Sequence, residues 1–310
     1  MAPVMISTIR SGALAALAAL ALFSAAQAAP VAGPAYVDDL HKWRTRADES
    51  LKRERGWLSI VTRDELSPGS YRIGSAPDNQ VVLPKALSPA HLGTITVGGD
   101  KAQLALAAGQ RMRTVAKDDA GEEFATRDLV TGATRLEWVT SGRLSLHFVK
   151  REDGKIVVRA ADRDSPRRRT FAGRAWYEPK PELRVPARFV PHAQGATIPI
   201  ANVRGEISYE KVAGTLEFSV DGQKMSLDAL DDDGALFVIF RDGTSSSTTY
   251  PPGRFLVVEK PKDGNWLVDF NKAFNPPCAV SAFTTCPLPP PQNWLKSDIP
   301  AGEKYLGRKS

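Results

Sequence analysis

Both cysteines of this 310-residue chain lie in one proline-rich stretch, NPPCAVSAFTTCPLPPP, between residues 275 and 291. Cys278 and Cys286 have seven residues between them, so a disulfide would close a short loop and add roughly 2–3 kcal/mol in the chain-entropy model. Free thiols and a metal site are the alternatives. A zinc site needs two more ligands, which nothing in the sequence brings to the pair, and the C-x-x-C spacing of redox sites is absent. We therefore predict a disulfide and no metal ion.

Polar side chains with catalytic potential gather in and before this stretch. Carboxylates and a phenol suit acid–base chemistry, and an arginine suits the binding of an anion. The same residue types also serve in turns and buried ion pairs, and an Asp-Gly pair is a common turn. We favour such structural roles, and Glu303 and Lys304 of the motif AGEK belong to the same polar group. The catalytic candidates are Asp242, Tyr250, Arg254, Asp269 and Asn271.

The densest charge cluster of the chain lies around the sequence DSPRRR, residues 164–169. Arg163, Arg167 and Arg168 are candidates for binding a phosphate, a sulfate or a carboxylate. Asn275, at the start of the proline-rich stretch, is a fourth ligand candidate. A salt-bridged loop surface is the alternative for the arginines, and it is the one we favour.

Familiar catalytic templates are absent from the sequence, which has no G-x-S-x-G elbow, no H-E-x-x-H motif and no P-loop. We expect no cofactor. The formal net charge is +6, but acidic and basic residues are interspersed, so we expect no nucleic-acid partner. Binding and catalysis both stay open as functions.

The first 28 residues have the layout of a secretory signal peptide. Arg10 precedes an apolar run without charges that ends in Ala26-Gln27-Ala28, an A-x-A cleavage pattern. The apolar core of about 13 residues is shorter than the ~20 that cross a bilayer. We predict cleavage after Ala28, a mature chain without a transmembrane segment, and a location in the periplasm or outside the cell.

One clear helix signal follows, from Tyr36 to Arg55. Apolar residues recur there at steps of three and four, against a charged remainder, which is typical of an amphipathic helix. Gly56 is the expected end of the helix.

From residue 57 onward the chain consists of short β-type runs, such as RLSLHFVK and KIVVRA. Pairs such as Asp221-Gly222 and Asp233-Gly234 separate them, and both residue types tolerate the positive φ of hairpin turns. No helical pattern alternates with the runs, which argues against a parallel α/β sheet. We predict a mainly-β fold: an antiparallel sandwich or barrel, either single or as two fused β subdomains.

We divide the chain into a signal peptide (1–28), an N-terminal helix (29–56), a β subdomain (57–175) and a second β subdomain (176–310). The boundary near residue 175 follows a proline-rich stretch without a clear strand before Leu183. The second subdomain ends in the proline- and cysteine-rich segment. Large apolar residues in that segment favour packing on the sheet over a disordered tail; they are Phe274, Phe283, Leu288, Trp294 and Leu295.

The stretch DFNKAFNPPCAVSAFTTCPLPPPQNWLKSDIPAGEK, residues 269–304, resembles the signature of the DUF1684 family of bacterial and archaeal proteins. KRERGWLSI, VRAADRDSPRRRTFAGRAWYEP and LFVIFRDGTSSSTTYPPGRFL resemble further blocks of the family, so the resemblance covers residues 45–305. Where relatives usually continue TSG, this chain reads Thr244-Ser245-Ser246-Ser247 and lacks the turn glycine. The family name records an unknown function, so the resemblance implies no activity.

A second stretch, within residues 71–97, resembles the core of a forkhead-associated domain. Ser88 and His91 have the spacing of that family, but Ser75 stands where its phosphopeptide readers carry arginine. Because the main phosphate donor is missing, the resemblance implies a β-sandwich and not phosphopeptide binding.

Three functions follow as hypotheses. The first is an exported, β-rich binding protein of the cell envelope, with a small polar or anionic ligand. The second is a hydrolytic enzyme that uses the Asp, Asn and Arg residues near the C-terminal signature. The third is an envelope assembly factor whose proline-rich end docks a partner protein.

Overall fold

The computed structural model describes residues 33–98, 101–115, 121–129, 137–151, 153–261 and 264–307. The predicted signal peptide, residues 1–28, lies outside the described residues. The described chain is mainly antiparallel β-sheet with few helices, as the sequence predicted. No helix of the described part combines the length and apolarity needed to cross a bilayer.

Helix α1 (Pro34–Leu51) is the predicted amphipathic helix, and it ends four residues before the predicted end at Arg55. It ends early because the chain folds back on its last turn. The Lys52 N–H donates to two carbonyls of that turn, the Gly56 N–H donates to the Arg53 carbonyl, and a short 3-10 helix (Trp57–Ser59) comes next. Gly56 permits this close return, since a Cβ there would lie 2.8 Å from the Leu51 carbonyl oxygen.

The first group of strands forms a β-sandwich of two sheets. All pairs are antiparallel except β2–β3. The six-stranded sheet has the order β1 (Ile60–Leu66), β11 (Ile156–Asp162), β10 (Leu144–Lys150), β9 (Glu137–Ser141), β6 (Met112–Thr114) and β7 (Glu123–Phe124). The five-stranded sheet has the order β3 (Val81–Val82), β2 (Gly69–Gly74), β4 (Gly93–Gly98), β5 (Lys101–Leu106) and β8 (Thr126–Asp128). Alternate apolar residues of both sheets, such as Ile95 and Leu146, meet in one core.

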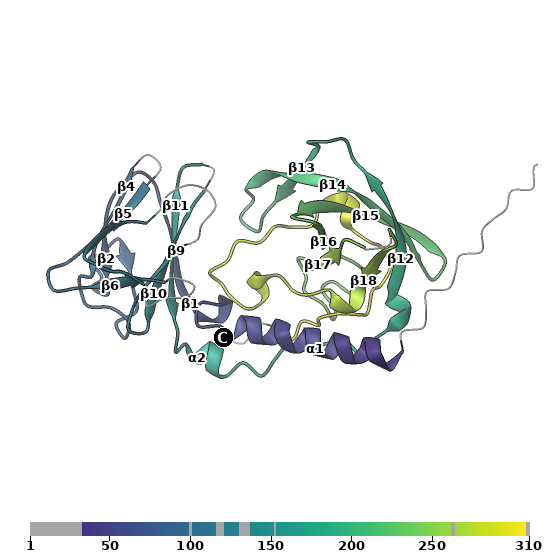
Figure 1. Cartoon of the computed structure of the whole chain (residues 1–310), viewed down its shortest axis with the longest axis horizontal. Helices are drawn as coiled ribbons and strands as arrows, with labels where there is room; N and C mark the ends of the chain where they lie inside the picture. The colour runs from purple at the N-terminus through teal and green to yellow at the C-terminus, as the bar shows by residue number, and fades with distance from the viewer. Residues whose placement is uncertain are drawn as a thin grey trace, which may run out of the picture.

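The second group of strands curls into a barrel-like, nearly closed sheet, with its two end strands close together (Figure 1). Its order is β17 (Arg254–Glu259), β16 (Ala235–Phe240), β15 (Gln223–Asp232), β14 (Ile207–Val220), β12 (Arg184–Pro191) and β18 (Trp266–Asp269); β13 (Thr197–Ala201) pairs with β14 outside this path. The predicted Asp-Gly turns join its hairpins, with φ of 48° at Asp221 and 44° at Asp233. Ser246, in the stretch where the family resemblance leads us to expect a turn glycine, also has a positive φ, 79°.

The C-terminal segment after β18 lies across the barrel, as predicted from its apolar residues. It contains three 3-10 turns, η3 (Phe270–Lys272), η4 (Pro277–Ala279) and η5 (Pro291–Asn293). Phe270, Ile299 and Ala301 are fully buried in the barrel core, whose strands they close off. The prolines cannot donate the backbone hydrogen bonds of a β-ladder, so burial of these apolar side chains stabilises the segment instead.

Helix α1 packs along the barrel and not on the sandwich that follows it in the chain (Figure 1). The Tyr36 hydroxyl donates to Asp269 Oδ1 at 2.8 Å, and Arg44 Nη2 donates to the Asn271 carbonyl at 3.4 Å. The helix therefore belongs to the barrel, although the strands of the sandwich come directly after it in the sequence.

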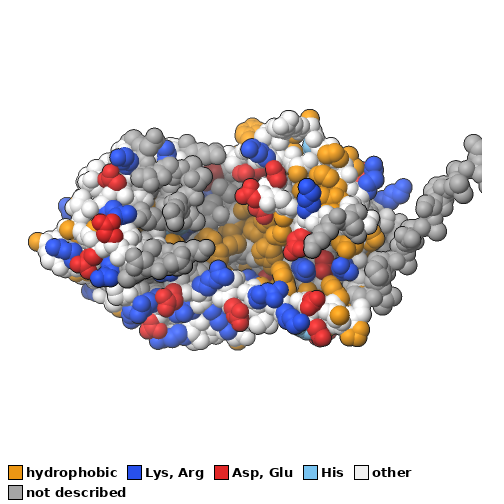
Figure 2. Space-filling model, viewed as in Figure 1, with side chains coloured by type: hydrophobic (Ala, Val, Ile, Leu, Met, Phe, Trp, Pro, Cys, Tyr) orange, Lys and Arg blue, Asp and Glu red, His pale blue; other side chains and the backbone are white. Residues whose placement is uncertain are grey.

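Ion pairs tie the sandwich to the barrel. Arg204, after β13, lies 2.9 Å from Glu65 on β1, and Glu206 lies 3.1 Å from Arg151 at the end of β10. The short segment between the two groups of strands contains α2 (Pro166–Arg169) and η2 (Pro181–Leu183). In the face shown in Figure 2, acidic and basic side chains of the described residues are intermixed.

Candidate functional site

Two of the catalytic candidates, Asp242 and Arg254, form a buried ion pair beneath the C-terminal segment. Arg254 Nη2 lies 2.7 Å from Asp242 Oδ2, and neither side chain is exposed. Arg254 also donates to the carbonyls of Ile299 and Ala301, and Asp242 Oδ1 accepts from the Thr244 and Ile299 N–H groups. The pair thus holds the C-terminal segment on the barrel.

Asp269 and Asn271 fasten other parts of the chain. Asp269 accepts from the Tyr36 hydroxyl and from the Asn271 N–H. The Asn271 amide donates to the carbonyl of Lys180 at 2.7 Å and accepts from its N–H at 2.7 Å. Burial, with the nearby Asp269 carboxylate, raises the pKa of Tyr36 far above its usual value, so Tyr36 stays a neutral donor.

The arginine candidates largely serve the backbone. Arg167 donates to the Ile60 carbonyl, and Arg168 donates to the carbonyls of Lys52 and Arg163. These bonds brace α2 against the end of α1 and the start of β1. Of the three predicted arginines, the structure brings Arg167 to a cavity and leaves Arg163 and Arg168 outside it.

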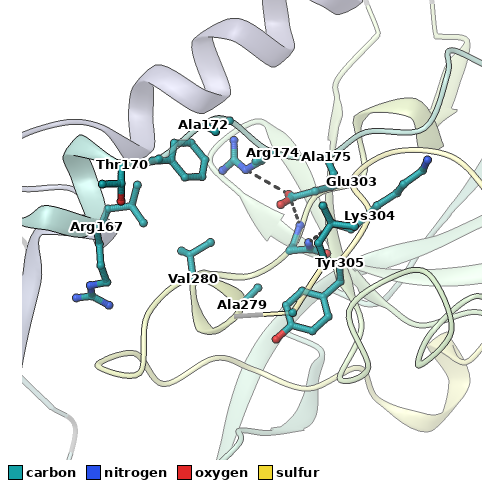
Figure 3. Close-up of a pocket in the computed structure, with 16 residues that line it drawn as sticks. Arg167, Thr170, Ala172, Arg174, Ala175, Ala279, Val280, Glu303, Lys304 and Tyr305 are labelled. Carbon is teal, nitrogen blue, oxygen red and sulfur yellow. Dashed lines mark hydrogen bonds and ion pairs between the residues drawn. The ribbon is translucent and has the colours of Figure 1, made fainter. Parts of the chain in front are cut away.

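That cavity, of about 210 Å³, lies between the segment after α2, the disulfide-bonded loop and residues 303–307 near the C-terminus (Figure 3). Much of its lining is apolar: Leu58, Phe171, Ala172, Ala175, Ala279, Val280 and Leu306. In Figure 3, Ala279 and Val280 lie across from Thr170, while Glu303 and Tyr305 border the opposite end. We refer to it as the Glu303 cavity.

Glu303 is the buried acid of this cavity, with 4% of its surface exposed. Its Oε2 accepts from the Asn275 N–H at 2.8 Å and lies 3.2 Å from Arg174 Nε. Burial raises the pKa of Glu303 to about 7, against the opposing effects of Arg174 and Asn275, and the Asp48 carboxylate adds to the rise. The group therefore changes charge near neutral pH.

Arg174 balances this acid from the cavity wall. It lies between Glu303 and Asp48, whose Oδ1 is 3.5 Å from Nη1, and its guanidinium packs over the Trp176 ring at 5.9 Å. Two carboxylates thus face one buried guanidinium, which favours protonation of one of them.

Asn275 is one of the lining residues, and one of its polar atoms has no partner. Its Nδ2 donates to the Lys304 carbonyl at 3.0 Å, which sets the orientation of the amide. Its buried Oδ1 accepts no hydrogen bond from any described residue. A buried acceptor without a donor costs about 1–3 kcal/mol, so this amide is incompletely satisfied in the folded chain.

The predicted Cys278–Cys286 disulfide is present. It closes the loop whose η4 turn supplies Ala279 and Val280 to the cavity wall. The Cys278 N–H also donates to Cys286 Sγ at 3.2 Å. The bond therefore fixes one wall of the Glu303 cavity. Among the described residues, no three His, Cys, Asp or Glu side chains gather as a metal site.

Sequence reasoning named Asn275 and Arg167 among the ligand candidates and Glu303 only as one of several polar residues. It missed Arg174 and Asp48. No local signal marks these two, because their role depends on α1 lying beside the segment after α2. The nearest sequence signal was the density of polar residues in the C-terminal motif.

The comparisons with known proteins agree with the resemblance of the C-terminal signature. The family model described as "Protein of unknown function (DUF1684)" matches residues 169–304, which include most of the cavity lining. The chain is similar to an uncharacterised protein of Haloarcula marismortui with a solution NMR structure. The two are 33% identical over 44% of this chain and 79% of that one, with a TM-score of 0.37. No curated protein matches the chain.

Proposed function

Since this chain belongs to the DUF1684 family, whose function is unknown, we propose from its own geometry that it is a small-molecule binding protein and that the Glu303 cavity is its site. The observation that carries the proposal is a mainly apolar cavity, one of whose lining residues, Asn275, has a buried Oδ1 without a partner. Cavities of this kind, with few polar groups among apolar walls, are typical ligand sites.

The lining also indicates what the ligand carries. Oδ1 of Asn275 requires a hydrogen-bond donor, such as a hydroxyl group. The charged groups beside it are engaged within the protein, because Arg174 lies beside the carboxylates of Glu303 and Asp48, and Arg167 donates to the Ile60 carbonyl. The side chain of Lys304 extends away from Val280 (Figure 3). We therefore propose a small, uncharged, mainly apolar molecule with a hydroxyl group, in preference to an anion.

Binding is favoured over the hydrolytic alternative by the state of the candidate catalytic residues. The carboxylates of Asp242 and Asp269 already accept hydrogen bonds from the protein. Asp242 is also fully enclosed, and Asp269 supports the Tyr36 hydroxyl and the backbone of the turn at Asn271. The assembly-factor alternative would require the proline-rich segment to be free, whereas it is packed on the barrel.

We propose further that the protein acts after export, in the periplasm or outside the cell. The layout of residues 1–28 and the Cys278–Cys286 disulfide support this, since structural disulfides persist in oxidising compartments. Mass spectrometry of the protein from a periplasmic fraction would test it: a mature chain that begins at Ala29 is expected, and an intact Met1 in the cytosol would oppose it.

The ligand proposal is tested with three probes of similar size: phenol, toluene and benzoate. Isothermal titration of the full chain should show that affinity decreases from phenol to toluene to benzoate. Phenol should bind at least several-fold more tightly than toluene, because one hydrogen bond adds roughly 1 kcal/mol. Asn275→Ala should remove the preference for phenol over toluene. Asn79→Ala, which changes a buried asparagine of the sandwich, is the matched control and should keep it. Equal binding of phenol and toluene by the unmodified chain would refute the proposal.

A further inference from the structure

A second recess lies at one end of the barrel and shares no lining residue with the Glu303 cavity. It is an open groove of about 1030 Å³ between β12, β14, β15 and the C-terminal segment 292–297. Phe218, Met225 and Leu295, which belong to or pack on the barrel core, form its apolar part. Its polar and charged lining residues include Arg188, Glu217, Gln223, Lys224, Gln292 and Lys296.

Trp294 presents an exposed indole ring at this groove, with 53% of its surface exposed. Its Nε1 donates to the Pro289 carbonyl at 3.0 Å. The guanidinium of Arg241 lies 5.1 Å from the ring centroid, and Arg241 is not part of the groove lining. Arg241 therefore covers one face of the indole, while Trp294 as a whole stays half exposed and lines the groove.

The ring is held rigidly by the segment that carries it. The neighbouring Asn293 is buried, with its Oδ1 accepting from the Asp228 N–H at 2.7 Å and its Nδ2 donating to the carbonyls of Asp228 and Ile239, each at 2.9 Å. Pro290 and Pro291 precede it and restrict the backbone. Because the indole is ordered before any ligand arrives, binding on it loses little conformational entropy.

We propose that this groove binds an acidic oligosaccharide, with one sugar ring stacked on Trp294. The electron-rich face of an indole attracts the C–H face of a sugar ring. Gln223 accepts from the Ser297 hydroxyl and Gln292 donates to Asp228, and the second polar atom of each amide suits the hydroxyl groups of a sugar. Arg188, Lys224 and Lys296 outnumber Glu217, so the formal charge of this lining is three minus one, or +2.

The surroundings of the indole favour a sugar over a protein partner. Aromatic hot spots of protein interfaces lie in the centre of apolar contact regions from which water is excluded. Trp294 is instead the one exposed aromatic residue in the lining of this groove, whose other lining residues include exposed charged and amide side chains.

The test is isothermal titration of the full chain with a galacturonic acid tetramer and with the neutral cellotetraose. The acidic tetramer should bind more tightly, and its affinity should fall with added salt. Trp294→Ala should weaken its binding roughly tenfold, in the range of an aromatic contact residue. Trp294→Phe should retain most of the affinity.

Tyr209→Ala is the matched control, because Tyr209 is an exposed aromatic residue on β14 outside the groove. This variant should bind the acidic tetramer as tightly as the unmodified chain does. Phenol binding should be unchanged in Trp294→Ala, which separates this site from the Glu303 cavity. The proposal is overturned if neither tetramer binds, if both bind equally, or if Trp294→Ala binds the acidic tetramer unchanged.

Discussion

Replacement of Glu303 by glutamine should change how the stability of the protein depends on pH. Burial raises the pKa of Glu303 from 4.5 to about 7 in the folded state. Between these values the folded state binds the proton more tightly than the unfolded state, so stability decreases as pH rises through this window. Since one pKa unit corresponds to ~1.4 kcal/mol, the full decrease is about 3 kcal/mol.

The assay is urea unfolding of the unmodified chain and of Glu303→Gln at several pH values from 4.5 to 8. Glutamine is neutral throughout, so the free energy of unfolding of the unmodified chain minus that of the variant should fall by about 3 kcal/mol across the range. Taking this difference removes the contributions of all other titrating groups that the two proteins share. Glu210→Gln, which changes an exposed carboxylate on β14, serves as a control and should give a difference with little slope.

Two results would contradict the reasoning. A difference in unfolding free energy that stays constant with pH would mean that Glu303 has the same pKa in the folded and the unfolded state. A difference that grows with pH would mean that the ion pair with Arg174 outweighs burial, which reverses the order of causes on which the prediction depends.

Four further changes give expected outcomes that urea unfolding can check. Burial, with Arg159 nearby, lowers the pKa of His147 from 6.5 to about 4. The unmodified chain should therefore lose about 3 kcal/mol of stability as the pH falls from ~6.5 to ~4, and this loss should be absent in His147→Phe. An unchanged dependence of stability on acid pH in the variant would oppose this. Asp242→Asn should cost ~3–5 kcal/mol at pH 7, since it leaves a buried guanidinium unpaired, and a loss under 1 kcal/mol would show that the ion pair is dispensable. The double change Cys278→Ser and Cys286→Ser should cost about 2–3 kcal/mol, with no loss expected if the loop is held by packing alone. Ser246→Gly should stabilise the chain by ~1 kcal/mol, because the positive φ of 79° at this position suits glycine; a neutral or destabilising result would mean that the serine is not strained.

Local patterns in the sequence predicted much of the fold. The runs of alternating residues became strands, and the Asp-Gly pairs at 221 and 233 became hairpin turns because their conformation depends on only two residues. The end of α1 was wrong by four residues, since the return of the chain at Gly56 depends on contacts with the preceding turn.

The sequence by itself determined the mainly-β class, the amphipathic helix, the packed C-terminal segment and the one possible disulfide, since each depends on composition or on neighbours along the chain. Only the tertiary structure decided that α1 packs on the barrel, that Asp242 and Arg254 are buried together, and that Asp48, Arg174 and Glu303 meet at one cavity. The contacts at the cavity join residues more than one hundred positions apart, as Asp48 and Arg174 are, and the buried pair joins two different strands' ends and loops. A buried carboxyl acquires a pKa near neutral only from the groups that folding brings around it.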